Sequence, residues 1–174
     1  MSQISDLVAS RLRDIPDFPK PGVMFKDFTP LIADGPALRE LVRDIAQRYA
    51  GSVDVIVGIE ARGFILGAAV AYELELGMVP VRKAGKLPGD TLRESYALEY
   101  GTAEIEVHTD AFEAGQRVLV IDDVLATGGT AEATALLVER AGAKLAAIEV
   151  VLELAFLEGR KRLADRPVNA ILTL

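Results

Sequence analysis

The chain has 174 residues, of which 51% are hydrophobic and 26% are charged, and its formal net charge is −7. This length and composition predict one globular domain over residues 1–174, and the negative charge argues against broad binding to nucleic acid or to an anionic membrane. The absence of cysteine excludes disulfides and thiolate chemistry. The N-terminus has neither an apolar signal centre nor a membrane span, so the expected location is the cytoplasm.

Hydrophobic periodicity predicts helices and strands that alternate along the chain. A first helix is expected to end before Pro16, an irregular loop follows in PDFPKPGVMF, and residues 36–50 form the next helix. The predicted strands are VDVIVGI, MVPV, RVLVI, LAAIEVVLEL and VNAILTL, with helices at GFILGAAVAYEL and AEATALLVERAGA. This alternation indicates an α/β fold with an open, mostly parallel twisted sheet flanked by helices.

Residues 82–110 depart from the alternation. The polar stretch RKAGKLPGDTLRES is expected to be a long loop, and the two short alternating runs after it, SYALEY and AEIEV, are expected to form a β-hairpin that stands apart from the parallel sheet. Long loops within compact domains are commonly functional or disordered.

The stretch RVLVIDDVLATGGTAEA is the main candidate for a binding site. Asp122 and Asp123 fall at the expected carboxyl end of a parallel strand, where open α/β sheets bind ligands. Two carboxylates there could accept hydrogen bonds from vicinal hydroxyls of a sugar or hold a hydrated divalent cation. The small residues that follow, next to a helix N-terminus, could form a phosphate cradle. The pattern therefore suggests a phosphorylated sugar.

Other interpretations of this stretch stay open on pattern alone. An apolar strand, an acid and a glycine turn also occur in plain strand-to-helix connections, and paired acids at a strand end occur in phospho-acceptor signalling domains. The stretch is neither a G-x-G-x-x-G dinucleotide fingerprint nor a P-loop, because no lysine follows the glycines.

Whole motifs add a resemblance to a known family. VLVIDDVLATGGT resembles the phosphoribosyl-diphosphate (PRPP) binding motif of the type I phosphoribosyltransferases. PDFPKPGVMFKDFTPLI, GIEARGFILG, RKAGKLPG and ESYALEYG are similar, in the same order, to segments of the adenine phosphoribosyltransferase family. The resemblance covers nearly the whole chain. It implies the type I phosphoribosyltransferase fold, with an N-terminal hood segment at about 1–33 and a flexible lid and β-hairpin at about 82–110.

The resemblance also implies a reaction: purine salvage, in which adenine and PRPP give AMP and pyrophosphate. It implies Mg²⁺ as cofactor, held mainly through PRPP and water with no protein ligand, and a cytoplasmic homodimer. Two alternatives remain from the residues: transfer to another nucleobase, or a non-catalytic PRPP-binding regulator. The regulator is disfavoured by the acidic charge, by the lack of a basic helix-turn-helix and by the intact lid motif.

The family motifs assign expected roles to residues of this sequence. The 5′-phosphate would bind Ala126, Thr127, Gly128, Gly129 and Thr130, and the ribose would bind Asp122 and Asp123. Pyrophosphate would meet Glu60, Ala61, Arg62, Lys83 and Lys86, the lysines acting within their own subunit or from a neighbour. Adenine would meet Met24, Phe25, Lys26 and Leu154. Glu99 is the expected general acid or base, with Tyr100 beside it in the lid. A cis peptide bond is expected between Glu60 and Ala61.

Without the resemblance several of these residues have ordinary explanations. Lys83 and Lys86 would be solvated charges, Glu99 a solvent-facing strand residue, and Phe25 a core residue. Lys26 is a mild departure, because family members often have arginine there. His108, although its type suits proton transfer, lies outside every matched motif and is expected to be a surface residue of the hairpin.

Overall fold

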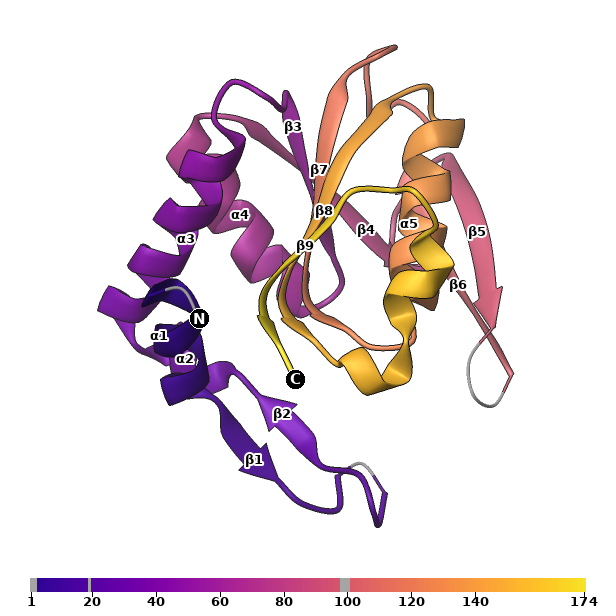
Figure 1. Cartoon of the computed structure of the whole chain (residues 1–174). Coiled ribbons are helices and arrows are strands. Elements are labelled where there is room, and N and C mark those ends of the chain that lie inside the picture. The colour runs from indigo at the N-terminus through magenta and orange to yellow at the C-terminus, as the bar shows by residue number, and fades with distance from the viewer. Residues whose placement is uncertain (1–2, 19, 98–100) are drawn as a thin grey trace.

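The computed structural model describes residues 3–18, 20–97 and 101–174 (Figure 1). Its helices are α1 (Gln3–Arg11), α2 (Thr29–Ala33), α3 (Gly35–Tyr49), α4 (Arg62–Leu74) and α5 (Gly129–Arg140), with short 3-10 turns η1 (Ala155–Leu157) and η2 (Gly159–Leu163). Its strands are β1 (Arg13–Ile15), β2 (Phe25–Asp27), β3 (Val55–Ile59), β4 (Gly77–Lys83), β5 (Thr91–Ala97), β6 (Thr102–His108), β7 (Arg117–Leu125), β8 (Lys144–Glu153) and β9 (Val168–Thr173). The expected α/β class is confirmed.

The order of the strands creates a place for a ligand. Over the described residues, the main sheet has the order β5-β6-β4-β3-β7-β8-β9. From β4 to β9 the neighbours are parallel, whereas β6 is antiparallel to both β4 and β5. The chain leaves β3 through α4 toward one edge of the sheet and leaves β7 through α5 toward the other. The carboxyl ends of β3 and β7 therefore form a topological switch point, where sheets of this kind bind ligands.

Helices cover both faces of the sheet, with α3 and α4 on one side and α5 on the other (Figure 1). The central strands accordingly send alternate side chains to two hydrophobic clusters. In β7, Leu119 and Ile121 pack in the cluster with α3 and α4, while Val118 and Val120 pack in the cluster with α5. Burial on both faces explains why the predicted strands read as continuous apolar runs.

Local signals explain where the predicted helices begin. Asp34 is the N-cap of α3, and its carboxylate accepts a hydrogen bond from Ala37 N at 3.1 Å. Leu41 and Ile45 are both fully buried on the inward face of that helix. None of the helices among the described residues combines the length and the apolar character needed to cross a bilayer.

The expectation that the β5–β6 hairpin stands apart from the sheet is wrong. β6 pairs with the end of β4 through Arg82↔Glu106 and Lys83↔Ile105, so the main sheet continues into the hairpin. The physical reason is burial: Ile105 and Val107 are 2% and 0% exposed, and this apolar side of β6 packs in the core on the α5 side. β5 also begins at Thr91, earlier than expected.

Two boundaries near the candidate site also differ from expectation. β7 continues past RVLVI to Leu125, and Asp122 still pairs with Val150 of β8, so the two aspartates lie inside the last part of the strand. The PDFPKPGVMF loop connects a short antiparallel pair in which Arg13 faces Asp27. The sequence analysis did not predict this pair, α2 or the two 3-10 turns.

Candidate active site

A cavity of about 730 Å³ lies at the switch point, between the ends of β3 and β7 and the hood segment. Its volume is in the range of sites for small molecules. The predicted site residues that line it are Met24, Phe25, Lys26, Glu60, Ala61, Arg62, Lys83, Asp122, Asp123, Ala126, Thr130 and Leu154. Residues far apart in the chain thus meet in one place, as the motif assignments require.

The loop from Ala126 to Thr130 borders a smaller hollow of about 80 Å³ together with Asp122. Gly128, the N-cap of α5, has φ of 82°, a left-handed conformation that glycine adopts without steric cost. A side chain at Gly128 would overlap the carbonyl oxygen of Gly159, so η2 packs directly behind the loop. The first turn of a helix offers N–H groups and a positive dipole end, and this hollow can therefore take an anion such as a phosphate.

The two aspartates differ in their surroundings. Burial, followed by the charge of Asp123, raises the pKa of Asp122 well above its ordinary value, and Arg62 opposes this shift. Asp123 N donates to Asp122 Oδ1 at 2.9 Å. Asp123 Oδ2 lies 2.7 Å from Arg62 Nε, but that N–H is not aligned with it, and among the described residues this buried oxygen has no hydrogen-bond partner. This oxygen can accept a hydrogen bond from a ligand hydroxyl or from water.

Arg62 connects the aspartate side of the cavity to the hood. It is the first residue of α4, and its guanidinium carbon lies 5.5 Å from the ring centroid of Phe25 and 5.7 Å from that of Phe28. These are cation–π distances, and the same side chain makes the ion pair with Asp123. A fixed positive charge therefore lies between the aromatic hood residues and the carboxylates.

The predicted cis peptide bond between Glu60 and Ala61 is present. The Glu60 carboxylate accepts a hydrogen bond from Lys83 N at 3.0 Å and one from Arg82 Nη2 at 3.4 Å. The Lys83 N–H, with a smaller contribution from Arg82, lowers the pKa of Glu60 despite its partial burial. The carboxylate is thus engaged with the end of β4, which places Lys83 at the edge of the cavity.

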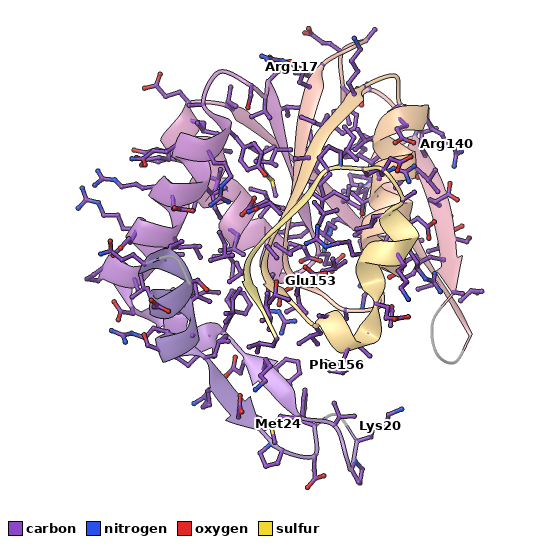
Figure 2. The ribbon with its side chains drawn as sticks, viewed as in Figure 1. Lys20, Met24, Arg117, Arg140, Glu153 and Phe156 are labelled. Atoms are coloured by element: carbon purple, nitrogen blue, oxygen red, sulfur yellow. The ribbon has the colours of Figure 1, made fainter. Side chains whose placement is uncertain are left out.

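The hood forms an apolar wall. The rings of Phe18 and Phe25 meet edge to face with centroids 5.1 Å apart. The charge of Lys26 is paired within the hood, because its Nζ lies 2.7 Å from Asp14 Oδ1. Leu154 and Leu157 also line the cavity. Figure 2 shows Met24 on the hood and Phe156 on the turn after β8, below the main sheet in that view. A flat apolar ligand fits between such walls.

Comparison with known proteins identifies the family. Residues 32–168 match the family described as phosphoribosyl transferase domain. An adenine phosphoribosyltransferase of Salinispora tropica is 64% identical over 174 residues, which covers 99% of this chain and 92% of the relative. This chain belongs to the adenine phosphoribosyltransferase family.

Solved structures of the same family have the same fold. The adenine phosphoribosyltransferase of Thermoanaerobacter pseudethanolicus is 46% identical with a TM-score of 0.93, over 97% of this chain and 99% of that one. The enzyme of Saccharomyces cerevisiae is 37% identical with a TM-score of 0.94, over 99% of this chain and all of that one (100%). Its crystal structure is a complex with adenine and an imino-altritol bisphosphate.

Some residues that the adenine phosphoribosyltransferase motifs suggest do not line the main cavity. Thr127, Gly128 and Gly129 line only the smaller hollow. Lys86 is exposed and is not among the lining residues, so its role stays a prediction. Glu99 and Tyr100 lie outside the described residues.

His108 lies on the hairpin away from the cavity. Its Nε2 is 2.8 Å from the carbonyl oxygen of Pro88, and it borders a separate hollow with residues 88–90. This position agrees with the expectation of a surface role.

Some residues of the site are not predicted by the sequence motifs. Tyr96 of β5 lines the main cavity, and a side chain at Gly129 would lie 3.0 Å from Tyr96 Cδ2, so its ring packs against the start of α5. Gly159 packs behind the loop from Ala126 to Thr130. The alternation in SYALEY could have indicated that Tyr96 faces inward, whereas the contact between Gly128 and Gly159 carries no signal in either segment.

Proposed function

We propose that this chain transfers the 5-phosphoribosyl group from PRPP to adenine and releases pyrophosphate, forming AMP for purine salvage. The observation that carries the proposal is the meeting, at one switch point, of the loop from Ala126 to Thr130 at the start of α5, the adjacent Asp122 and Asp123, and the Arg62 charge. Membership of the adenine phosphoribosyltransferase family supports the choice of base.

In this proposal, the 5′-phosphate accepts backbone hydrogen bonds in the loop from Ala126 to Thr130. The ribose hydroxyls then lie at Asp122 and Asp123, where the Asp123 oxygen without a hydrogen-bond partner can accept a hydroxyl hydrogen. The repulsion between the two carboxylates becomes tolerable when a donor lies between them.

The pyrophosphate of PRPP lies toward Arg62 and Lys83. As the bond between the anomeric carbon and pyrophosphate breaks, negative charge grows on the leaving group, and preorganised positive charge there lowers the barrier. Arg62 is already held in the cavity by Asp123 and Phe25, so it needs little reorganisation. Lys86 is proposed to assist from its own loop or from a neighbouring subunit.

Adenine lies against the hood, stacked on Phe25 and enclosed by Met24 and Leu154, with the backbone near Lys26 contacting the edge of the base. Attack by a ring nitrogen on the anomeric carbon requires that the base lose a proton. Glu99 is the proposed general acid or base for that transfer, and Tyr100 is proposed to pack beside it. Exclusion of water by the hood and lid protects the cation-like carbon from hydrolysis.

Mg²⁺ is proposed to accompany PRPP. Among the described residues, no group of three or more acidic, histidine or cysteine side chains is arranged to hold a metal ion. Asp122 and Asp123 suit a hydrated ion that arrives on substrate oxygens, because Mg²⁺ keeps several waters and is commonly held through phosphates. The ion would neutralise charge on the pyrophosphate.

We further propose that the enzyme is a cytoplasmic homodimer. Family resemblance supports the dimer, and so does the apolar surface of α4, where Tyr72 and Ile65 are 86% and 46% exposed. Light scattering of the purified chain, compared with the 18.6 kDa mass of one copy, tests the dimer.

The test of the proposed function is pyrophosphate release from PRPP with adenine, hypoxanthine, guanine, xanthine and orotate, with and without Mg²⁺. We expect turnover with adenine that requires Mg²⁺, and a large loss in the variants Asp123→Asn and Glu99→Ala. Asp54→Asn is the matched control, because Asp54 pairs with Arg117 (2.6 Å) at the opposite end of the sheet from the site (Figure 2). Turnover with another base alone would contradict the assignment to adenine.

A further inference from the structure

Glu106 on β6 is a buried carboxylate for which the proposed reaction has no role. It is 0% exposed and lies between Arg82 of β4 and Arg93 of β5 in the strand register. It is not among the residues that line the cavity. β6 is the strand of the β5–β6 hairpin that pairs with β4 of the main sheet (Figure 1). Burial of an ionised carboxylate is costly unless hydrogen bonds compensate for it, so its contacts need an explanation.

The compensating donors come mainly from the backbone after β4. Glu106 Oε1 accepts hydrogen bonds from Lys86 N and Leu87 N, each at 2.8 Å. Burial alone would raise the pKa of Glu106, but hydrogen bonds from Leu87, Gly85 and Lys86 outweigh it, and the pKa lies below its ordinary value. Consecutive N–H groups that point at one anion form a nest. The loop is therefore wrapped around this carboxylate.

The other carboxylate oxygen closes the far end of the loop. Glu106 Oε2 accepts from Thr91 Oγ1 at 3.2 Å and lies 3.2 Å from Arg93 Nε. Both partners belong to β5, where the chain re-enters the sheet. One side chain thus holds the segment of residues 85–91 at both ends.

The start of the same segment is held from the cavity side. Glu60 accepts from Lys83 N at 3.0 Å, and Arg82 donates from Nη1 to the carbonyl oxygen of Lys86 at 3.0 Å. Two carboxylates, one in the cavity and one buried behind it, therefore fix the backbone of Lys83 and Lys86. These are the two lysines proposed to meet pyrophosphate.

We propose that Glu106 is a positioning residue for pyrophosphate: its carboxylate shapes the segment of residues 85–91 so that Lys83 and Lys86 present their charges to PRPP. The inference rests on the proposed function and deepens it. Backbone N–H groups of an exposed loop could bond to water instead, so a buried acid is not needed to satisfy them. The buried Glu106 carboxylate is explained if the segment of residues 85–91 must be held in a single conformation.

The test is a cycle of variants measured by steady-state kinetics and thermal unfolding of the full chain. Glu106→Ala is made in the wild-type chain and in a Lys83→Ala/Lys86→Ala background. Glu106→Gln retains an acceptor for the Lys86 and Leu87 N–H groups and is the conservative rescue. Glu104→Gln is the matched control, because Glu104 is on the same strand and its side chain faces Ser95 and Arg93. Its contact with the loop is made by its backbone carbonyl, which accepts a hydrogen bond from Ala84 N at 2.9 Å and is retained in the variant.

We expect Glu106→Ala to raise the KM for PRPP about tenfold, since a small displacement of a charged group weakens binding steeply. The KM for adenine should change less than about twofold, because the hood is untouched. Glu106→Gln should recover most of the loss, and Glu104→Gln should match the wild type. In the double-lysine background, Glu106→Ala should add no further increase, because the groups that it positions are gone.

Three results would overturn the proposal. Glu106→Ala could multiply the KM for PRPP by the same factor in both backgrounds, which would place its effect elsewhere. The double-lysine variant could bind PRPP like the wild type, or Glu106→Ala could lower only the unfolding temperature. If Glu106→Ala does not fold, the same cycle is run with Glu106→Gln, which should give a smaller but equally non-additive effect. A wild-type chain that forms no AMP would instead refute the proposed function itself.

Discussion

Gly63 offers a direct test of how closely the two halves of the site are packed. It is the second residue of α4, and a Cβ built on it would lie 2.6 Å from the carbonyl oxygen of Ile121 and 3.1 Å from Asp122 Oδ1. The first distance is far below van der Waals contact, and the obstacle is backbone, which cannot rotate away. Gly63→Ala must therefore push α4 and β7 apart at the point where Arg62 meets the aspartates.

The expected cost follows from this overlap. Inserting a methyl group into a well-packed interior costs about 1–3 kcal/mol. For a domain of this size each kcal/mol lowers the unfolding temperature by about 2–4 °C, so we expect Gly63→Ala to melt roughly 2–12 °C below the wild type. Displacement of Asp122 should also raise the KM for PRPP, by about tenfold.

Differential scanning fluorimetry and initial-rate kinetics measure both effects. Gly35→Ala is the matched control: Gly35 is also near the start of a helix, α3, but no atom lies within 4 Å of its Cβ position. That variant should be as stable as the wild type or gain about 0.4–1 kcal/mol. If Gly63→Ala has the same unfolding temperature and the same KM for PRPP as the wild type, the close packing of α4 on β7 does not determine the geometry of the site.

Three further predictions concern single side chains. Asp122→Asn should be more stable than the ligand-free wild type at neutral pH, because burial and Asp123 raise the pKa of Asp122 and its charged form is disfavoured in the fold. The advantage should shrink as the pH falls toward the ordinary aspartate pKa of 3.8 and vanish below it, where the wild-type side chain is protonated in both the folded and the unfolded state; unfolding temperatures across this pH range check it. Arg62→Lys retains the charge but loses the planar group over Phe25. In initial-rate assays the KM should therefore rise a few-fold, equivalent to about 1 kcal/mol, for adenine as well as for PRPP. An unchanged adenine KM would argue against a coupling between the two substrates through Arg62. Phe25→Leu should weaken adenine binding by about 1–3 kcal/mol if the base stacks there, and should raise the adenine KM more than the PRPP KM, which changes only through the lost contact with Arg62; isothermal titration with adenine tests it independently.

The sequence predicts much of this architecture because its signals are local and consistent. The apolar runs around Ile56 and Val120 alternate with helical periods, and that alternation suffices for a parallel sheet. The hairpin was misplaced because pairing between β4 and β6 is a non-local choice. Arg82 and Glu106 face one another in the ladder, yet nothing in either segment alone indicates the other. The 3-10 turns were missed for a related reason, because Gly159 is set by its contact with Gly128.

The site shows the same division between local and non-local information. The motifs single out Asp122, Asp123 and the loop from Ala126 to Thr130 along the chain, and the switch point brings the two aspartates, Ala126 and Thr130 into one cavity with Arg62. Motif letters do not reveal that the Glu60 carboxylate is engaged with Lys83 N and Arg82. Hydrogen bonds between a side chain and the backbone of another strand depend on the folded geometry. The family motif therefore assigns Glu60 to the pyrophosphate site without showing whether its carboxylate would contact pyrophosphate or hold the backbone of Lys83.

The contacts of Arg62 suggest why the two substrates can be handled together. One guanidinium group touches Phe25, on the proposed adenine side, and Asp123, on the proposed ribose side. The Asp123 contact is an ion pair without an aligned hydrogen bond, so the carboxylate can exchange Arg62 for a ribose hydroxyl at modest cost. Because Arg62 starts α4, such an exchange would be transmitted to the helix packed on β7, and to the aromatic hood residues Phe25 and Phe28 that Arg62 contacts. Binding of the sugar diphosphate would in this way set the position of the surface on which the base stacks.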